Sequence, residues 1–163
     1  MKLLTLILVL AGGLAAQTGL GALWPESLGY ADMMLVPVLW YAMAGSQRSG
    51  MLVGCAAGLL QDAWFQTGVF GISGFKKTAL GWLLGGLSAR FDVNRQTGRF
   101  VCGVLASLGD TVMDVGLRRL LDRVEPAPTL LEAAIRALVT GLLVVGAFGL
   151  VRRVRERRTG YRG

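Results

Sequence analysis

Long apolar runs separated by short polar stretches are the main pattern of this 163-residue chain. A helix that crosses a bilayer needs about 20 mostly apolar residues. Six runs predict such helices, at residues 3–23, 28–44, 50–65, 72–89, 98–121 and 129–151. The pattern therefore predicts an all-α membrane protein with six transmembrane helices in one compact bundle, residues 1–151, followed by a polar cytoplasmic tail, residues 152–163.

The first three runs differ in character. The first is longer than the apolar core of about 7 to 15 residues in a signal peptide, and further apolar runs follow it. We therefore expect an uncleaved first helix rather than a cleaved signal peptide. The second and third runs are short and contain Asp32, Pro37 and Asp62, so we expect them to kink or to lie partly under their neighbours.

Composition narrows the classes of function. Hydrophobic residues make up 53% of the chain and charged residues only 17%, which is too apolar for an ordinary soluble domain. There is no histidine, so imidazole can serve neither as a general base nor as a metal ligand. Cys55 and Cys102 lie singly in apolar runs and form neither a metal motif nor a disulfide framework. We expect no metal and no cofactor.

Basic residues predict the orientation, because short loops rich in lysine and arginine stay in the cytoplasm. With the N-terminus inside, the cytoplasmic face carries eleven basic residues and the outer face three. The outer three are Arg118, Arg119 and Arg123. Both termini are therefore expected on the cytoplasmic side of a bacterial inner membrane.

Small residues recur every four positions on the third and fourth runs. One stripe is Gly50, Gly54 and Gly58, ending in Asp62; the other is Ser73, Lys77, Gly81, Gly85 and Ala89. Small residues allow helix backbones to approach closely in a membrane. We expect these glycines to pack the two helices together or to line a groove for a partner's helix.

Charged residues within apolar runs are costly unless they are paired or hydrated. The third and fourth helices run antiparallel, so Asp62 and Lys77 are both expected at their outer ends, and we predict that the two residues pair. The alternative is that both lie at the membrane surface in water. Lys76 is rotated about 100° from Lys77 on a helix, and we expect it to extend outward.

Asp110 and Asp114 lie four residues apart on the fifth run and raise the question of an enzyme. A CDP-alcohol phosphotransferase motif would need glycine where Ala106 stands, together with an upstream Asp-Gly-x2-Ala-Arg block that is missing. In a signal-peptidase-type aspartic protease, Asp62 and Asp110 could converge, but the motifs of that family are missing too. We expect a non-catalytic protein in which Asp110 makes an interhelical polar contact and Asp114 lies near the outer surface.

The last run has a capping box at its start and a basic cluster after its end. Thr129 and Glu132 fit the capping box, and Glu132 is also placed to pair with Arg136. The tail arginines are Arg152, Arg153, Arg155, Arg157 and Arg158. We expect these arginines to anchor the topology and to attract anionic lipids, with no binding of nucleic acid.

Several features together resemble the MreD family of the bacterial rod-shape machinery. They are Leu39-Trp40-Tyr41 at the end of the second run, the basic turn at Arg48, the Gly50-x3-Gly54-x3-Gly58-Leu59-Leu60-Gln61-Asp62 stripe, and the Gly68-Val69-Phe70-Gly71 loop. Asp110 and the basic Val151-Arg152-Arg153-Val154-Arg155 end are also similar.

The resemblance implies a membrane scaffold that acts with the bitopic protein MreC and the actin-like MreB. It also implies links to RodA and its penicillin-binding partner. The family is thought to share its six-helix fold with substrate-binding components of energy-coupling-factor transporters, which supplies an alternative function. Such a component needs a pocket near the outer side, whereas the glycine stripes suggest helices drawn together. Self-association stays open.

Overall fold

The computed structural model describes residues 3–23, 32–44, 46–65, 70–88, 96–121 and 128–159; of the side chains beyond Val151, it describes that of Arg153. These residues form six helices in chain order. They are α1 (Leu3–Leu23), α2 (Leu35–Ala44), α3 (Gln47–Phe65), α4 (Ile72–Ser88), α5 (Gln96–Leu120) and α6 (Leu130–Thr159). The all-helical expectation is confirmed.

Local hydrogen bonds explain why α2 and α3 begin at residues other than those expected. Before α2, the Met34 N–H donates to Asp32 Oδ1 at 3.0 Å and the Leu35 N–H donates to the Asp32 carbonyl at 3.2 Å, so a turn replaces the expected helix over 32–34. The remaining expected residues, 28–31, lie outside the described part. The α3 helix begins early because Ser46 and Ser49 cap it, each accepting the other's backbone N–H.

The last helix is longer than the sequence pattern predicts. It starts one residue after Thr129, whose side chain and that of Glu132 form the expected capping box. It then continues to Thr159, eight residues past the expected end at Val151. Arginine and glutamate favour helix, so the basic segment extends the helix instead of ending it.

Among the residues that the structure describes, three helices have the length and composition of membrane spans: Leu4–Leu23, Gln96–Leu120 and Leu130–Val151. The α2 helix is apolar but only 10 residues long, and α3 and α4 have 19 and 17 residues. The expected six spans thus become six helices in the described part of the chain, of which three can cross a membrane by length and composition.

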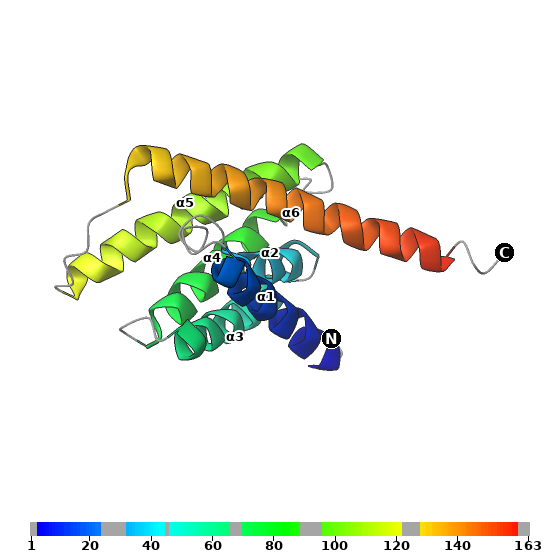
Figure 1. Ribbon diagram of the computed structural model, residues 1–163, viewed down its shortest axis with the longest axis horizontal. Coiled ribbons are helices and arrows are strands. Elements are labelled where there is room, and N and C mark those ends of the chain that lie inside the picture. The colour runs from blue at the N-terminus through cyan, green and yellow to red at the C-terminus, as the bar shows by residue number, and fades with distance from the viewer. Residues whose placement is uncertain are drawn as a thin grey trace.

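The helices pack as two groups. The α3 and α4 helices make the closest pair, and α2 lies against both; α5 and α6 form a second pair, and α1 has few contacts. Figure 1 shows α5 and α6 side by side and the end of α6 projecting past the other helices. A buried cluster joins α2, α4, α5 and α6: Leu35, Leu39, Ala42, Leu80, Leu84, Cys102, Ala106, Val144 and Phe148.

Candidate functional site: a glycine interface and a buried ionic network

Glycines hold α3 and α4 in backbone contact. A methyl group built on Gly54 would overlap the Lys77 carbonyl, and one on Gly58 would overlap the Ser73 carbonyl. The opposite stripe behaves likewise: a methyl on Gly81 would overlap the Gly50 carbonyl, and one on Gly85 would lie 2.7 Å from Gln47 Cα. The prediction that the two stripes face each other is confirmed.

We call this contact the glycine interface; its members are Gly50, Gly54, Gly58, Gly81 and Gly85. It decides whether these glycines pack α3 against α4 or line a groove for a partner's helix. Each of them approaches the backbone of the other helix of the same chain. No room is left for a partner's helix along these stripes, so the partner-groove alternative is wrong for these glycines. They pack the protein's own helices.

Asp62 closes the glycine interface at one end. Its Oδ2 accepts backbone hydrogen bonds from Gly71 at 2.9 Å, Ser73 at 3.1 Å and Gly74 at 3.3 Å. Gly71 has a φ of 102°, a conformation that L side chains rarely adopt. The carboxylate at the end of α3 thus caps the N-terminus of α4, where unpaired N–H groups and the helix dipole favour a negative charge.

Lys77 has a different partner from the one predicted. Its Nζ lies 2.6 Å from Asp32 Oδ2, and both residues are buried, at 1% and 3% exposure. The predicted pairing of Lys77 with Asp62 is therefore wrong. The physical reason is that Asp62 turns to the backbone N–H groups of α4, while the turn before α2 brings Asp32 beneath the lysine.

Lys76 also differs from expectation. It is only 5% exposed and does not extend outward; its Nζ lies 2.6 Å from Asp114 Oδ1 and 3.4 Å from Asp110 Oδ2. The outward direction predicted from helix geometry is wrong because α5 packs against that face of α4 and supplies two carboxylates. Asp114 is partly exposed and also accepts a hydrogen bond from Arg118 Nε at 2.7 Å.

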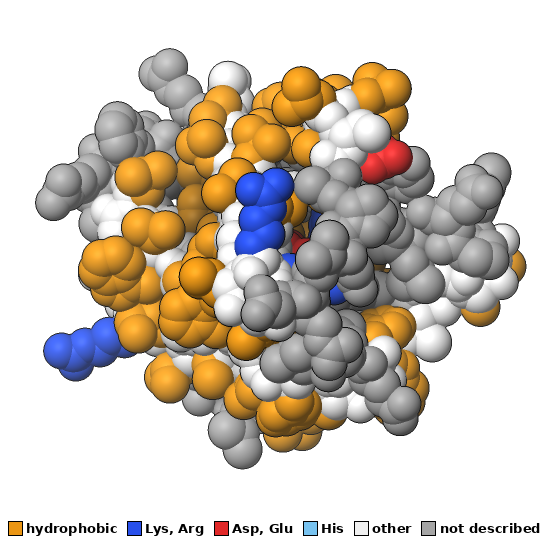
Figure 2. All heavy atoms as spheres, turned by 90° about the vertical axis from the view of Figure 1, so that its left-hand side faces the viewer, with side chains coloured by type: hydrophobic (Ala, Val, Ile, Leu, Met, Phe, Trp, Pro, Cys, Tyr) orange, Lys and Arg blue, Asp and Glu red, His pale blue; other side chains and the backbone are white. Residues whose placement is uncertain are grey.

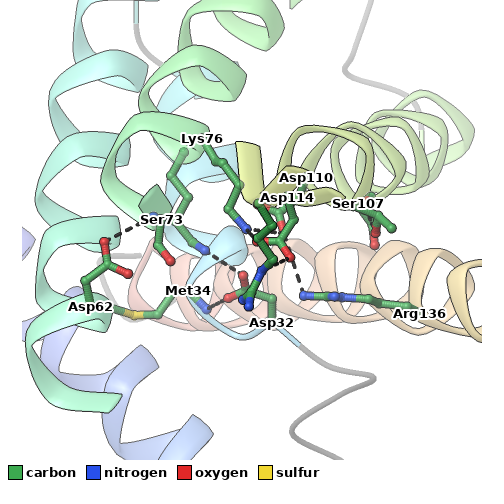
Figure 3. A network of polar contacts seen from close by, with 12 residues as sticks. Asp32, Met34, Asp62, Ser73, Lys76, Ser107, Asp110, Asp114 and Arg136 are labelled. Carbon is green, nitrogen blue, oxygen red and sulfur yellow. Dashed lines mark hydrogen bonds and ion pairs between the residues drawn. The ribbon is translucent and has the colours of Figure 1, made fainter. Parts of the chain in front are cut away.

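Asp110 makes interhelical contacts with two helices. Besides Lys76 of α4, it faces Arg136 of α6, whose Nη2 lies 3.6 Å from Asp110 Oδ2. Arg136 therefore pairs across the helices and not with Glu132, as the spacing along α6 suggested. Figure 3 shows Asp110, Asp114 and Lys76 meeting, with Arg136 reaching toward them along α6.

These contacts form what we call the ionic network: Asp32, Lys76, Lys77, Asp110, Asp114, Arg118 and Arg136. It connects the turn before α2 with α4, α5 and α6. It lies at the end of the molecule where α3 and α5 finish and where α4 and α6 begin, which we call the network end. Figure 2 faces this end and shows basic and acidic side chains near its middle among hydrophobic ones.

Some buried oxygens beside the ionic network have no hydrogen-bond partner within the described part of the chain. They are Ser107 Oγ, Asp110 Oδ1 and Thr140 Oγ1. Among the described residues, no three Asp, Glu or Cys side chains are grouped so that they could hold a metal ion. The chemistry that the described contacts do provide is ion pairing between helices, which in an apolar surrounding fixes which helix faces which.

Sequence reasoning missed Asp32, Lys76 and Arg136 as members of the buried network. One signal in the sequence could have found them. All three are charged residues within apolar runs of a chain that has few charges. Because a charge in lipid is costly unless it is paired, each of them needs a partner. The tail arginines lie within the last turns of α6, and the side chain of Arg153 is exposed.

The fold and the buried charges define a class. The described chain is all-helical, three of its helices have the length and composition of membrane spans, and ion pairs link α4, α5, α6 and the turn before α2 in its interior. Such a chain is a helical membrane protein. The particular family follows from comparison: the model of the rod shape-determining protein MreD matches residues 1–154, and the chain belongs to the MreD family. No curated protein and no solved structure matches it.

Proposed function

We propose that the protein is a non-catalytic scaffold of the bacterial cell-elongation machinery. In this role it binds an MreC-like bitopic protein, acts with MreB and with RodA and its penicillin-binding partner, and helps direct peptidoglycan synthesis and cell shape. The observation that carries the proposal is the match of the MreD model over residues 1–154 of the chain.

The interior of the protein supports a structural role. Asp62 caps a helix, and Lys76, Lys77, Asp32 and Asp110 are engaged in ion pairs between elements. Such contacts fix the arrangement of helices, which is what a scaffold needs in order to present constant surfaces to several partners. The surfaces available for a partner's helix are then the outward apolar faces of the long helices, including Leu8, Val112 and Leu142.

The proposed location is the cytoplasmic membrane, with both termini in the cytoplasm, residues 1–151 in or at the membrane and residues 152–163 as the basic tail. The distribution of basic residues supports this orientation. The network end then lies on the outer side, and the tail arginines lie at the anionic cytoplasmic leaflet, which attracts basic residues.

Co-purification in mild detergent tests the partner. We expect the tagged protein to retain an MreC-like protein encoded in the same cell. Arg48→Gln, at an exposed polar position of α3 outside the apolar faces of the long helices, serves as a surface control that keeps the interior intact. Recovery of the protein without any MreC-like partner, under conditions where the purified protein remains monodisperse, would contradict the proposal.

The alternative function is a substrate-binding component of a vitamin or small-molecule transporter. One observation favours it: charged side chains lie near the middle of the network end, where Trp64 and Phe70 are also exposed. Cells depleted of the protein would then lose uptake of one vitamin and keep their shape. A scaffold of cell elongation predicts the reverse.

A further inference from the structure

Arg136 makes the longest ion pair of the ionic network. Its guanidinium has five N–H donors, yet its one contact within the described part of the chain is with Asp110 Oδ2, 3.6 Å from Nη2. A charged hydrogen bond to a carboxylate is normally about 2.7–2.9 Å long. The same oxygen also faces Lys76 Nζ at 3.4 Å, and the other oxygen of Asp110 has no hydrogen-bond partner among the described residues. Arg136 therefore lacks a carboxylate of its own.

The guanidinium of Arg136 is also open to its surroundings. The side chain of Arg136 is 25% exposed, whereas that of Asp110 is 1% exposed. The polar atoms that are enclosed and without a partner in the described part of the chain include none of the nitrogens of Arg136. A group from outside the chain can thus reach these donors, while Asp110 stays behind them.

Arg136 lies well inside the apolar level of the chain. It comes six residues after Leu130, where the span of α6 starts, so its Cα is about 9 Å further along the helix axis. The guanidinium then turns deeper, toward Asp110, which is ten residues, or about 15 Å, from the end of the α5 span at Leu120. Figure 3 shows the side chain of Arg136 extended along α6 toward Asp110. Since the hydrocarbon core is about 30 Å thick, this charge lies nearer its middle than the headgroups.

The face of α6 that continues from Arg136 is open. Val139, Leu143, Gly146 and Leu150 follow at alternating steps of three and four residues, which places them on one side of the helix. All of them are partly or fully exposed, and a methyl group built on Gly146 meets nothing within 4 Å. Helices pack along one another with this spacing in coiled coils and in many membrane bundles. A single helix can therefore lie along α6 and pass Arg136.

We propose that Arg136 docks a transmembrane helix of a partner that carries an aspartate or glutamate at the level of the guanidinium. Charge complementarity selects this occupant, because a partly exposed cation at this depth is costly until an opposite charge pairs with it. Lipid phosphates lie outside the hydrocarbon core, too far out for a guanidinium that turns toward Asp110. A carboxylate also suits the planar guanidinium, which can donate two parallel hydrogen bonds to it. The inference rests on the proposed scaffold role for the kind of partner, a bitopic protein with one such helix.

Binding of model helices to the purified full chain tests this site. The probe is a synthetic leucine-alanine transmembrane peptide with one glutamate at its centre, and the matched peptide has glutamine there. A central position gives the same depth for either orientation of the peptide. Energy transfer between dyes on the chain and on the peptide reports binding in a neutral detergent. We expect the glutamate peptide to bind the wild-type chain at least about tenfold more tightly than the glutamine peptide.

Substitutions assign this preference to one side chain. Arg136→Gln should reduce it to about twofold or less, and Arg136→Lys, which keeps the charge, should retain part of it. Arg136→Glu should instead favour a peptide with a central lysine. Arg119→Gln removes an exposed arginine at the end of α5 and should leave the preference unchanged. Unchanged elution volume and helical circular dichroism establish that each variant is folded.

Equal affinity of the two peptides for the wild-type chain would overturn the proposal, as would a preference that survives in Arg136→Gln. Displacement of the glutamate peptide by excess phosphatidylglycerol would assign Arg136 to a lipid phosphate and overturn the assignment to a partner's helix. Dimerisation of the chain that is lost in Arg136→Gln would assign the site to a second copy and overturn it too.

The site and the scaffold role can fail separately. Because no partner protein is present in this titration, a negative result rejects the helix site at Arg136 and leaves the proposed scaffold role untouched. Conversely, cells that keep their rod shape without the protein would reject the scaffold while the titration still stands.

Discussion

Substitution of Gly54 by alanine tests the glycine interface directly. The added methyl group would overlap the backbone carbonyl of Lys77, and its next neighbours, the Lys77 carbonyl carbon and the Thr78 nitrogen, also belong to the backbone. A backbone cannot turn away as a side chain can, so α3 and α4 must move apart. Overpacking of a tight interior costs about 1–3 kcal/mol, and we expect the upper half of this range.

A matched control lies on α1. Gly12 and Gly19 are also helical glycines, but a methyl built on either meets nothing within 4 Å. Alanine is the better helix former by up to about 1 kcal/mol, so Gly12→Ala should be neutral or stabilising. The two substitutions add the same atom to the same type of element, and only the surroundings differ.

The assay is thermal unfolding of the purified protein in one detergent. Unfolding is measured as the fraction of protein that remains monodisperse after heating. With a shift of about 2–4 °C per kcal/mol for a chain of this size, Gly54→Ala should lower the midpoint by about 4–12 °C. Gly12→Ala should leave the midpoint unchanged or raise it. Equal midpoints for the two variants would refute the close contact of α3 with α4.

Three other substitutions test the buried charges in the same thermal assay. Lys77→Met leaves the buried carboxylate of Asp32 without its partner and should lower the free energy of unfolding by about 3–5 kcal/mol. The double variant Lys77→Met, Asp32→Asn should recover part of this stability. No recovery in the double variant would argue against the pair. Asp62→Ala removes the acceptor of three backbone N–H groups and should cost about 0.5–2 kcal/mol; an unchanged midpoint would argue against the cap. Asp114→Asn should destabilise more than Arg118→Gln, because Asp114 also holds the nearly buried Lys76 while Arg118 is 32% exposed; the opposite order would show that the surface pair dominates.

Periodicity in the sequence was enough to predict where most helices lie and which faces of α3 and α4 meet. Glycines at four-residue spacing are informative because the same spacing is a geometric property of a helix, and it needs no knowledge of the rest of the fold. Helix ends were less predictable. The start of α2 depends on how the Asp32 side chain bonds the Met34 N–H, which no apolar pattern reports.

The partners of the charges could not be predicted, since they depend on which elements meet in space. Lys76 and Lys77 are neighbours in sequence, yet they pair with carboxylates 38 and 45 positions away in Asp114 and Asp32. Long side chains reach in several directions, so helix geometry alone gave the wrong direction for Lys76. The sequence singled out Asp62 as a charge in an apolar run, but its role as a cap appears only once α4 begins beside the end of α3.

Cell shape after depletion tests the central claim, that this chain is a scaffold of rod-shaped growth. The chromosomal copy is placed under a repressible promoter in the organism that carries it, and the ratio of cell length to width is followed by microscopy over several divisions. We expect rods to become spheres, and a plasmid copy of the wild-type chain to restore them. Cells that stay rod-shaped after the protein has been lost would contradict the claim, and loss of uptake of one vitamin in those same cells would favour the transporter alternative.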